Sequence, residues 1–170
     1  MRKMFVKTEN YRKFVSAVKA VEQRGAAEAG MMLVYGVPGL GKSHIVSSWA
    51  AETGAIFLRA NKDWTPRYAL SELAAALEID GRGNSQKLFA RLLKPIAANQ
   101  WPIVIDEAEF TLANQAASLE KIRDISDRAE NTVILIGMGN IQNDIKRYGQ
   151  ISSRIARVVE FLPATLEDVQ

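Results

Sequence analysis

Cysteine is absent from the 170 residues of this chain, and histidine occurs only once. The lack of cysteine excludes disulfides, thiolate nucleophiles and cysteine-ligated zinc, and a reducing cytoplasm is the simplest setting for such a chain. No apolar run approaches the roughly 18 residues that span a bilayer, and the basic start, MRKMFVKTENYRK, lacks the apolar segment of a signal peptide. Positive and negative charges nearly balance, because the formal net charge is only +3. So small an excess permits contact with nucleic acid without requiring it.

What the chain does contain is an alternation of short apolar runs and segments of helical period. Its length fits one domain with a sizeable core. The apolar runs are nearly continuous in Val, Ile and Leu, as in strands of a sheet that is covered on both faces. We therefore predict an α/β fold with five parallel strands and helices on both faces of the sheet. The predicted strands are residues 31–36, 55–60, 102–107, 132–137 and 156–162.

Apolar residues that recur every three or four positions predict the helices between these strands. The first helix is expected over residues 9–24, with Thr8 as its N-cap. Turn-like sequences, NKDWTPR and DGRGN, precede the third and fourth helices. The last six residues, TLEDVQ, look like the start of a helix that is then cut off. The other helices are predicted from the glycine-rich loop to about residue 52, around residues 70–77 and 88–96, from about 113 to 129, and near 141–147.

The stretch YGVPGLGKSHIV, residues 35–46, joins a predicted strand to a predicted helix. It contains the pattern G-x-x-x-x-G-K-[ST], whose glycines let backbone amides turn toward phosphates and whose helix directs its N-terminal dipole at the anion. Lys42 can reach the β- and γ-phosphates, and Ser43 can ligate Mg²⁺. For the side chain of His44 we expect a packing or surface role. We predict that ATP binds along Gly36, Val37, Pro38, Gly39, Leu40, Gly41, Lys42, Ser43 and His44.

A second motif, PIVIDEAE, ends an apolar strand in acidic residues. Asp106 falls at the carboxyl end of the strand, where a parallel sheet exposes its ligand-binding edge, and we predict that it holds Mg²⁺ directly or through water. Glu107 is then placed to polarise the attacking water as a general base. The alternative is a pair of solvated acids at a strand end. For Glu109 we expect a surface acid.

Two further residues are candidates for catalysis. Asn140 follows the strand 132–137, where a polar side chain can hydrogen-bond the γ-phosphate or the attacking water, although Asn also suits a turn. Arg154 precedes the last strand, where a cation can reach the γ-phosphate on a neighbouring subunit as an arginine finger. An ordinary surface arginine is the alternative, and Arg147 and Arg157 are further candidates for the same role.

Taken together, GVPGLGKS, IVIDEAE, Asn140 and the Ser153–Arg154 pair resemble the AAA+ ATPases, and within them the phage Mu B protein and related target-selection ATPases of bacterial transposons. The resemblance implies strand order 5-1-4-3-2 and a Mg²⁺-dependent ATP hydrolase. It divides the chain into a lead-in helix (residues 1–30), a nucleotide-binding core (31–163) and the start of a helical lid (164–170) that is otherwise absent. The chain would then be an excised or truncated core.

The same resemblance implies partners. ATP-bound subunits of that group assemble head to tail on duplex DNA, as filaments or rings, and bind it with little sequence preference through basic residues on phosphates. They then present the target DNA to a transposase. A helicase-loader type ATPase, or a nucleotide switch that never contacts DNA, are the alternatives. Possible DNA contacts are Lys62, Arg67, Arg82, Lys87 and Arg91, together with the lead-in Phe5–Tyr11, and solvated helix faces explain the five basic residues equally well.

Overall fold

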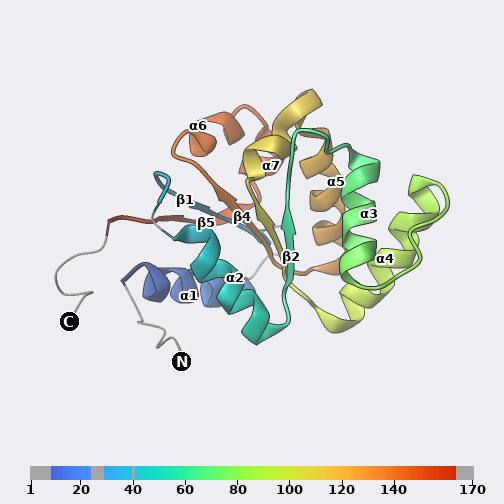
Figure 1. Cartoon of the computed structure of the whole chain (residues 1–170), viewed down its shortest axis with the longest axis horizontal. Helices are drawn as coiled ribbons and strands as arrows, with labels where there is room; N and C mark the ends of the chain where they lie inside the picture. The colour runs from blue at the N-terminus through green and yellow to red at the C-terminus, as the bar shows by residue number, and fades with distance from the viewer. Residues whose placement is uncertain (1–8, 24–28, 40, 164–170) are drawn as a thin grey trace.

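The computed structural model describes residues 9–23, 29–39 and 41–163. Five parallel strands form one sheet in the order β2-β3-β4-β1-β5, which is the predicted order 5-1-4-3-2 read from the other edge (Figure 1). The expected N-cap Thr8, most of the lead-in, Leu40 of the glycine-rich loop and the start of the lid lie outside the described residues. The strands are β1 (Met31–Tyr35), β2 (Ile56–Arg59), β3 (Ile103–Asp106), β4 (Val133–Gly137) and β5 (Ile155–Glu160).

The register of the sheet places the carboxyl ends of the strands on one edge. Tyr35 at the end of β1 pairs with Gly137 of β4 and with Glu160 of β5. Asp106 at the end of β3 pairs with Arg59 at the end of β2. Because all pairings are parallel, whatever follows these strands gathers at that edge.

Residues that alternate along the central strands pack into two separate clusters, one on each face of the sheet. Figure 1 shows α1 and α2 on one side, and α3, α4 and α5 on the other. This division explains why the central strands are apolar at every position. The cluster with α3, α4 and α5 contains Met31, Leu33, Ile103, Ile105, Val133 and Leu135, and the cluster with α1 and α2 contains Met32, Val34, Val104, Ile134 and Ile136.

Two of the helices begin at a side-chain cap. Thr65 accepts a hydrogen bond from the backbone N–H of Tyr68 at the start of α3, and Asn84 accepts one from Lys87 at the start of α4. No helix in the described part of the chain is long and apolar enough to cross a membrane. The helices are α1 (Glu9–Glu22), α2 (Lys42–Thr53), α3 (Pro66–Ala76), α4 (Ser85–Asn99), η1 (Ala108–Leu112), α5 (Ala113–Ala129), α6 (Ile141–Ile145) and α7 (Gly149–Ser152).

Two regions differ from the prediction. A 3₁₀ helix, η1, follows the acid pair directly, and Asn114, Gln115 and Ala116 at the start of α5 have positive φ. The predicted short helix near 141–147 is α6, and a second short helix, α7, which was not predicted, follows it before β5. Both differences concern the links that follow β3 and β4.

Candidate functional site

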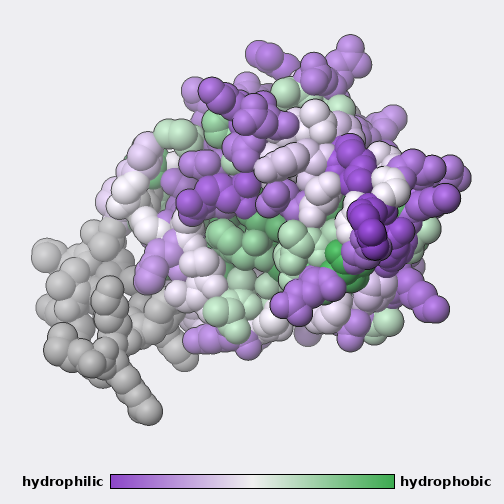
Figure 2. Space-filling view, turned by 45° about the vertical axis from the view of Figure 1, so that its right-hand side comes forward, coloured by the Kyte–Doolittle hydropathy of each residue, from purple (hydrophilic) through white to green (hydrophobic). Residues whose placement is uncertain are grey.

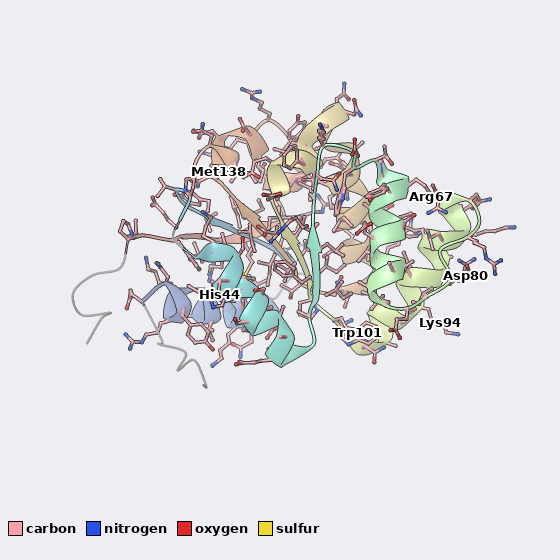
Figure 3. The ribbon with its side chains drawn as sticks, in the orientation of Figure 1. His44, Arg67, Asp80, Lys94, Trp101 and Met138 are labelled. Carbon is pink, nitrogen blue, oxygen red and sulfur yellow. The ribbon has the colours of Figure 1, made fainter. Side chains whose placement is uncertain are left out.

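A pocket of about 640 Å³ opens at the carboxyl ends of β1, β3 and β4. Its walls are the glycine-rich loop, the first turn of α2, the turn after β3 and the end of β4. Figure 3 labels two of the lining residues, His44 in the first turn of α2 and Met138 just beyond β4. The pocket therefore brings both predicted motifs together, since Lys42, Ser43, Asp106 and Glu107 all line it.

The glycine-rich loop has the backbone that the pattern predicts. Gly39 and Gly41 have φ of +87° and +73°, a region that favours glycine, and nothing lies within 4 Å of where a Cβ would stand at either position. The glycines are thus required by conformation and not by crowding. Gly41 caps α2 without any side-chain hydrogen bond, so the first N–H groups of this 12-residue helix have no side-chain acceptor. Such a helix start is a ready binding site for phosphate.

Lys42 points back into the loop. Its Nζ donates hydrogen bonds to the carbonyl oxygens of Gly36 (2.8 Å) and Val37 (2.9 Å). Burial lowers the pKa of Lys42, while the nearby carboxylates of Glu109 and Asp106 act to raise it. The ammonium group is therefore held at the pocket by neutral carbonyls, in a position from which it can exchange them for phosphate oxygens.

Asp106 is buried, with 3% of its surface exposed. One carboxylate oxygen accepts from the N–H of Glu107 (2.9 Å) and the other from Nη2 of Arg59 (3.3 Å). The Arg59 side chain is largely exposed, so this ion pair connects a buried acid to the surface of edge strand β2. A buried carboxylate with an exposed and exchangeable cation is chemically suited to accept a metal ion in that cation's place.

Glu107 is exposed and adopts the left-handed conformation, with φ 53° and ψ 46°. Non-glycine residues adopt this region at a cost, and such strain gathers at functional sites. The conformation ends β3 and turns the chain into η1. The two adjacent acids consequently differ in environment: Asp106 is buried and paired, and Glu107 is open to the pocket.

The donor set fits Mg²⁺ bound together with a nucleotide. Among the described residues no group of three or more His, Asp or Glu side chains gathers as an all-protein metal cage. Mg²⁺ keeps several waters and takes one or two protein oxygens plus substrate phosphates. Ser43 and Asp106, which both line the pocket, match that pattern.

Sequence reasoning missed two residues of the site. Glu109 is half-buried and lines the pocket, so the expectation of a surface acid is wrong. Its Oε1 accepts a hydrogen bond from the N–H of Met138, a contact that no spacing in the sequence signals. Arg59 is the other: it ends β2 beside Asp106, and no motif in the sequence signals the pair.

Asn140 lies at the N-terminal end of α6, where it is exposed and its carbonyl accepts from Asp144. The lining of the pocket on this side is formed by Ile136, Gly137 and Met138. The predicted contact of Asn140 with the γ-phosphate therefore stays a prediction.

Arg154 lies at the amino ends of the strands, whereas Lys42 follows the carboxyl end of β1. The residue after it, Ile155, pairs with the first residue of β1, whereas the glycine-rich loop follows the last residue of β1. The four residue steps from Met31 to Tyr35, at about 3.3 Å each, separate the two ends of β1 by about 13 Å. Arg154 Nε bonds both carboxylate oxygens of Asp127 at 2.9 and 3.1 Å, and its Nη1 bonds the carbonyl of Gln150.

Two of the basic residues considered for DNA contact have structural partners. Arg67 bonds Ser71 and the carbonyls of Gly81 and Gly83, and Arg91 bonds the carbonyls of Asp80 and Arg82. Both guanidinium groups thus hold the loop between α3 and α4. Arg82 itself pairs with Asp80 and keeps the pKa of that carboxyl low. Lys62 and Lys87 are exposed, and Figure 2 shows hydrophilic residues gathered toward the right-hand side of the molecule, with apolar residues in the middle of the same face.

A comparison with protein families decides the class of this fold. Residues 24–143, more than half of the chain, match the family model described as "AAA domain". The chain belongs to the AAA domain family. This membership confirms the predicted superfamily. The match ends at residue 143, so β5 and Arg154 lie beyond it. No curated protein matches the chain.

Several solved structures have the same fold. The Aeropyrum pernix ORC1 protein in complex with DNA has a TM-score of 0.66 at 20% identity, over 94% of this chain and 46% of that one. Cdc6p from Pyrobaculum aerophilum has 0.61 at 15% identity (98% and 49%). AMPPCP-bound DnaA from Aquifex aeolicus has 0.55 at 16% identity (92% and 48%). This AAA domain therefore spans just under half the length of these structures.

Proposed function

We propose that this AAA domain binds ATP with Mg²⁺ in the pocket at the carboxyl ends of β1, β3 and β4, and hydrolyses it. The observation that carries the proposal is the convergence of four parts in one pocket. These are the positive-φ glycine loop, the start of α2 that has no side-chain cap, Lys42, and the pair Asp106 and Glu107. A metal-free or acyl-transfer site has no need of this combination.

Each group of the pocket has a separate role in ATP binding or hydrolysis. Backbone N–H groups of the loop and of α2 bind the phosphates, and Lys42 exchanges the carbonyls of Gly36 and Val37 for β- and γ-phosphate oxygens. Ser43 and Asp106 would hold Mg²⁺, which would neutralise charge on those phosphates. Arg59 is the cation that the metal would replace at Asp106. Glu107 orients the attacking water and accepts its proton.

Arg154 completes the site only from a neighbouring subunit. Arg154 lies at the amino ends of the strands with its guanidinium bonded to Asp127, whereas the loop follows the carboxyl end of β1, so Arg154 is not placed to contact the nucleotide of its own subunit. A head-to-tail assembly brings the edge that carries Arg154 against the pocket of the next copy, which makes a heterologous contact and hence a ring or filament. In that assembly Arg154 exchanges Asp127 for the γ-phosphate, and Asn140 contacts the γ-phosphate or the water.

The partner of this ATPase is proposed to be duplex DNA, bound with little sequence preference. The resemblance of the sequence to the Mu B group supports a role in DNA transposition, in which the ATP-bound protein captures target DNA and presents it to a transposase. Helicase loading is the second candidate, because similar folds occur in an ORC1 protein in complex with DNA, in Cdc6p and in DnaA.

Fluorescence anisotropy of a labelled random-sequence duplex, at one fixed moderate salt concentration, tests the DNA proposal. We expect binding with a non-hydrolysable ATP analogue, weaker binding without it, and equal affinity for unrelated sequences. Lys42→Ala should abolish the dependence on nucleotide. Equal binding with and without the analogue, or no binding in either state, contradicts ATP-dependent DNA binding.

Affinity capture from the source cells separates the two partner hypotheses. The Glu107→Gln variant, arrested with ATP bound, is the bait, and Lys42→Ala is the matched control. A transposase retained only by Glu107→Gln supports target delivery. A hexameric replicative helicase retained in the same way supports helicase loading and contradicts the transposition proposal.

A further inference from the structure

Glu109 is the acid of this pocket that the mechanism above does not use. It lies in η1, two residues beyond the proposed general base Glu107, and it is half-buried. Its Oε1 accepts the backbone N–H of Met138, the first residue after β4, which Figure 3 labels at the upper end of that strand. A side chain from the turn after β3 is therefore bonded to the end of β4.

This bond lies where the pairing between β3 and β4 has stopped. The backbone pairing of these strands runs from Ile103 with Val133 to Ile105 with Leu135. Met138, the first residue after β4, is three residues beyond Leu135, and Asp106 pairs on its other side with β2. Glu109 therefore joins the two chain segments beyond their last paired residues, and both Glu109 and Met138 line the pocket.

The space around Gly137 shows how closely Glu109 packs against the end of β4. A Cβ at position 137 would lie 2.7 Å from Glu109 Oε1, and 2.5 and 2.8 Å from two side-chain carbons of Ile141. Real Cβ atoms do not approach neighbours so closely, so any larger residue moves Glu109, Ile141 or the strand. The absence of a side chain at Gly137 therefore leaves the space beside the strand end in which the Glu109 carboxylate lies.

Glu109 and Lys42 both line the pocket. Burial lowers the pKa of Lys42, and among the charged groups Glu109 acts most strongly to raise it, ahead of Asp106. Its charge consequently lies near the site proposed for the end of the triphosphate. With one oxygen occupied by the Met138 N–H, the carboxylate is held in place as an acceptor and does not take the role proposed for Glu107.

We propose that Glu109 is a positioning residue for ATP hydrolysis: by bonding Met138 N–H it fixes the turn that carries Glu107 relative to the end of β4. This inference rests on the proposed function. Glu109 need not touch the substrate. Its role is to set the separation between the general base and the strand end that leads to Asn140.

Two substitutions at 109 separate the hydrogen bond from the charge. Glu109→Gln keeps an acceptor oxygen for Met138 N–H and loses the charge, whereas Glu109→Ala loses both. We expect kcat of Glu109→Gln to remain within about threefold of wild type, and kcat of Glu109→Ala to fall about 10- to 100-fold, as for a small misplacement of a catalytic group. Both variants should show a lower KM for ATP, because a negative charge near the phosphates is removed.

Gly137→Ala perturbs the same contact without changing the acid, and it should lower kcat as Glu109→Ala does. Glu52→Ala, which removes an exposed acid in the last turn of α2, is the control and should leave kcat and KM unchanged. Hydrogen exchange at the Met138 amide supplies a readout independent of turnover. The amide should be protected in wild type and Glu109→Gln and should exchange faster in Glu109→Ala.

Equal loss of kcat in Glu109→Gln and Glu109→Ala would overturn the proposal, because it would make the charge the active feature. Unchanged kcat in Glu109→Ala, with active wild type, would overturn it as well and would leave the proposed function intact. Wild type that binds ATP but releases no more phosphate than Glu107→Gln would instead refute the proposed function, and the positioning role with it.

Discussion

Replacement of Arg154 by alanine tests whether this residue serves its own subunit or the next one. In the structure its guanidinium bonds both oxygens of Asp127, and each side chain is about one-fifth exposed. Asp127 keeps a second partner, Arg123, at 2.8 Å. The loss therefore falls between that of a surface pair and that of a buried pair, about 1–2 kcal/mol. For a domain of this size that corresponds to a fall in Tm of about 2–8 °C.

The expected catalytic effect is much larger than this loss of stability. An arginine finger contributes about 10³–10⁵ to kcat in enzymes that use one. We expect Arg154→Ala to bind ATP normally, because the residue is remote from its own pocket. Its turnover should stay low at every protein concentration, whereas wild-type turnover per subunit should rise with concentration as copies associate.

Mixing variants makes the test specific to a contact in trans. Lys42→Ala cannot bind ATP but retains Arg154, and Arg154→Ala binds ATP but lacks the finger. Phosphate release from the mixture should exceed the sum of the two separate rates. Arg128→Ala, which removes another arginine with an ion pair on α5, is the matched control and should retain turnover.

A different result would give Arg154 a purely structural role. If Arg154→Ala and Asp127→Asn lose similar stability and both hydrolyse ATP at the wild-type rate, the ion pair only holds α5 against the start of β5. If the mixture is no more active than its components, the trans contact is refuted.

Three other substitutions test further parts of the site. Lys42→Ala should weaken nucleotide binding at least about 100-fold, measured by titration with a fluorescent ATP analogue, because two or more charge-assisted hydrogen bonds are lost; an unchanged affinity would contradict the phosphate-loop assignment. Arg59→Ala should lower the Mg²⁺ concentration for half-maximal turnover by about two- to fivefold, because the metal then has no cation to displace from Asp106. A higher Mg²⁺ concentration for half-maximal turnover would contradict this exchange. Arg67→Ala should speed amide exchange in residues 80–83 and cost about 1–2 kcal/mol of unfolding free energy, with Lys87→Ala as the exposed control; unchanged exchange would remove its structural role.

The sheet was predictable because its information is local. Uninterrupted apolar runs fix the buried strands, and a strand followed by glycines and Lys42 fixes the loop between β1 and α2. The strand order came from the resemblance, because periodicity does not determine which strands are neighbours. The acid pair was placed correctly at the strand end because Asp106 directly terminates an apolar run.

Contacts between sequentially distant segments were not predictable. The sequence favours a surface acid at Glu109, because nothing in it shows that η1 contacts the end of β4. Arg59 becomes part of the site only because β2 is adjacent to β3. The guanidinium groups of Arg67 and Arg91 were equally suited by sequence to solvent or to phosphate, and their bonds to the loop between α3 and α4 depend on how that loop folds back.

The most direct test of the account compares wild type with Glu107→Gln in two assays on the same preparations, ATP binding and phosphate release at saturating Mg²⁺ and ATP. Removal of a general base lowers the rate about 10²- to 10⁴-fold. The account predicts that Glu107→Gln binds ATP as tightly as wild type and releases phosphate at least about 100 times more slowly. Wild-type turnover in Glu107→Gln would contradict the assignment of this pocket's chemistry.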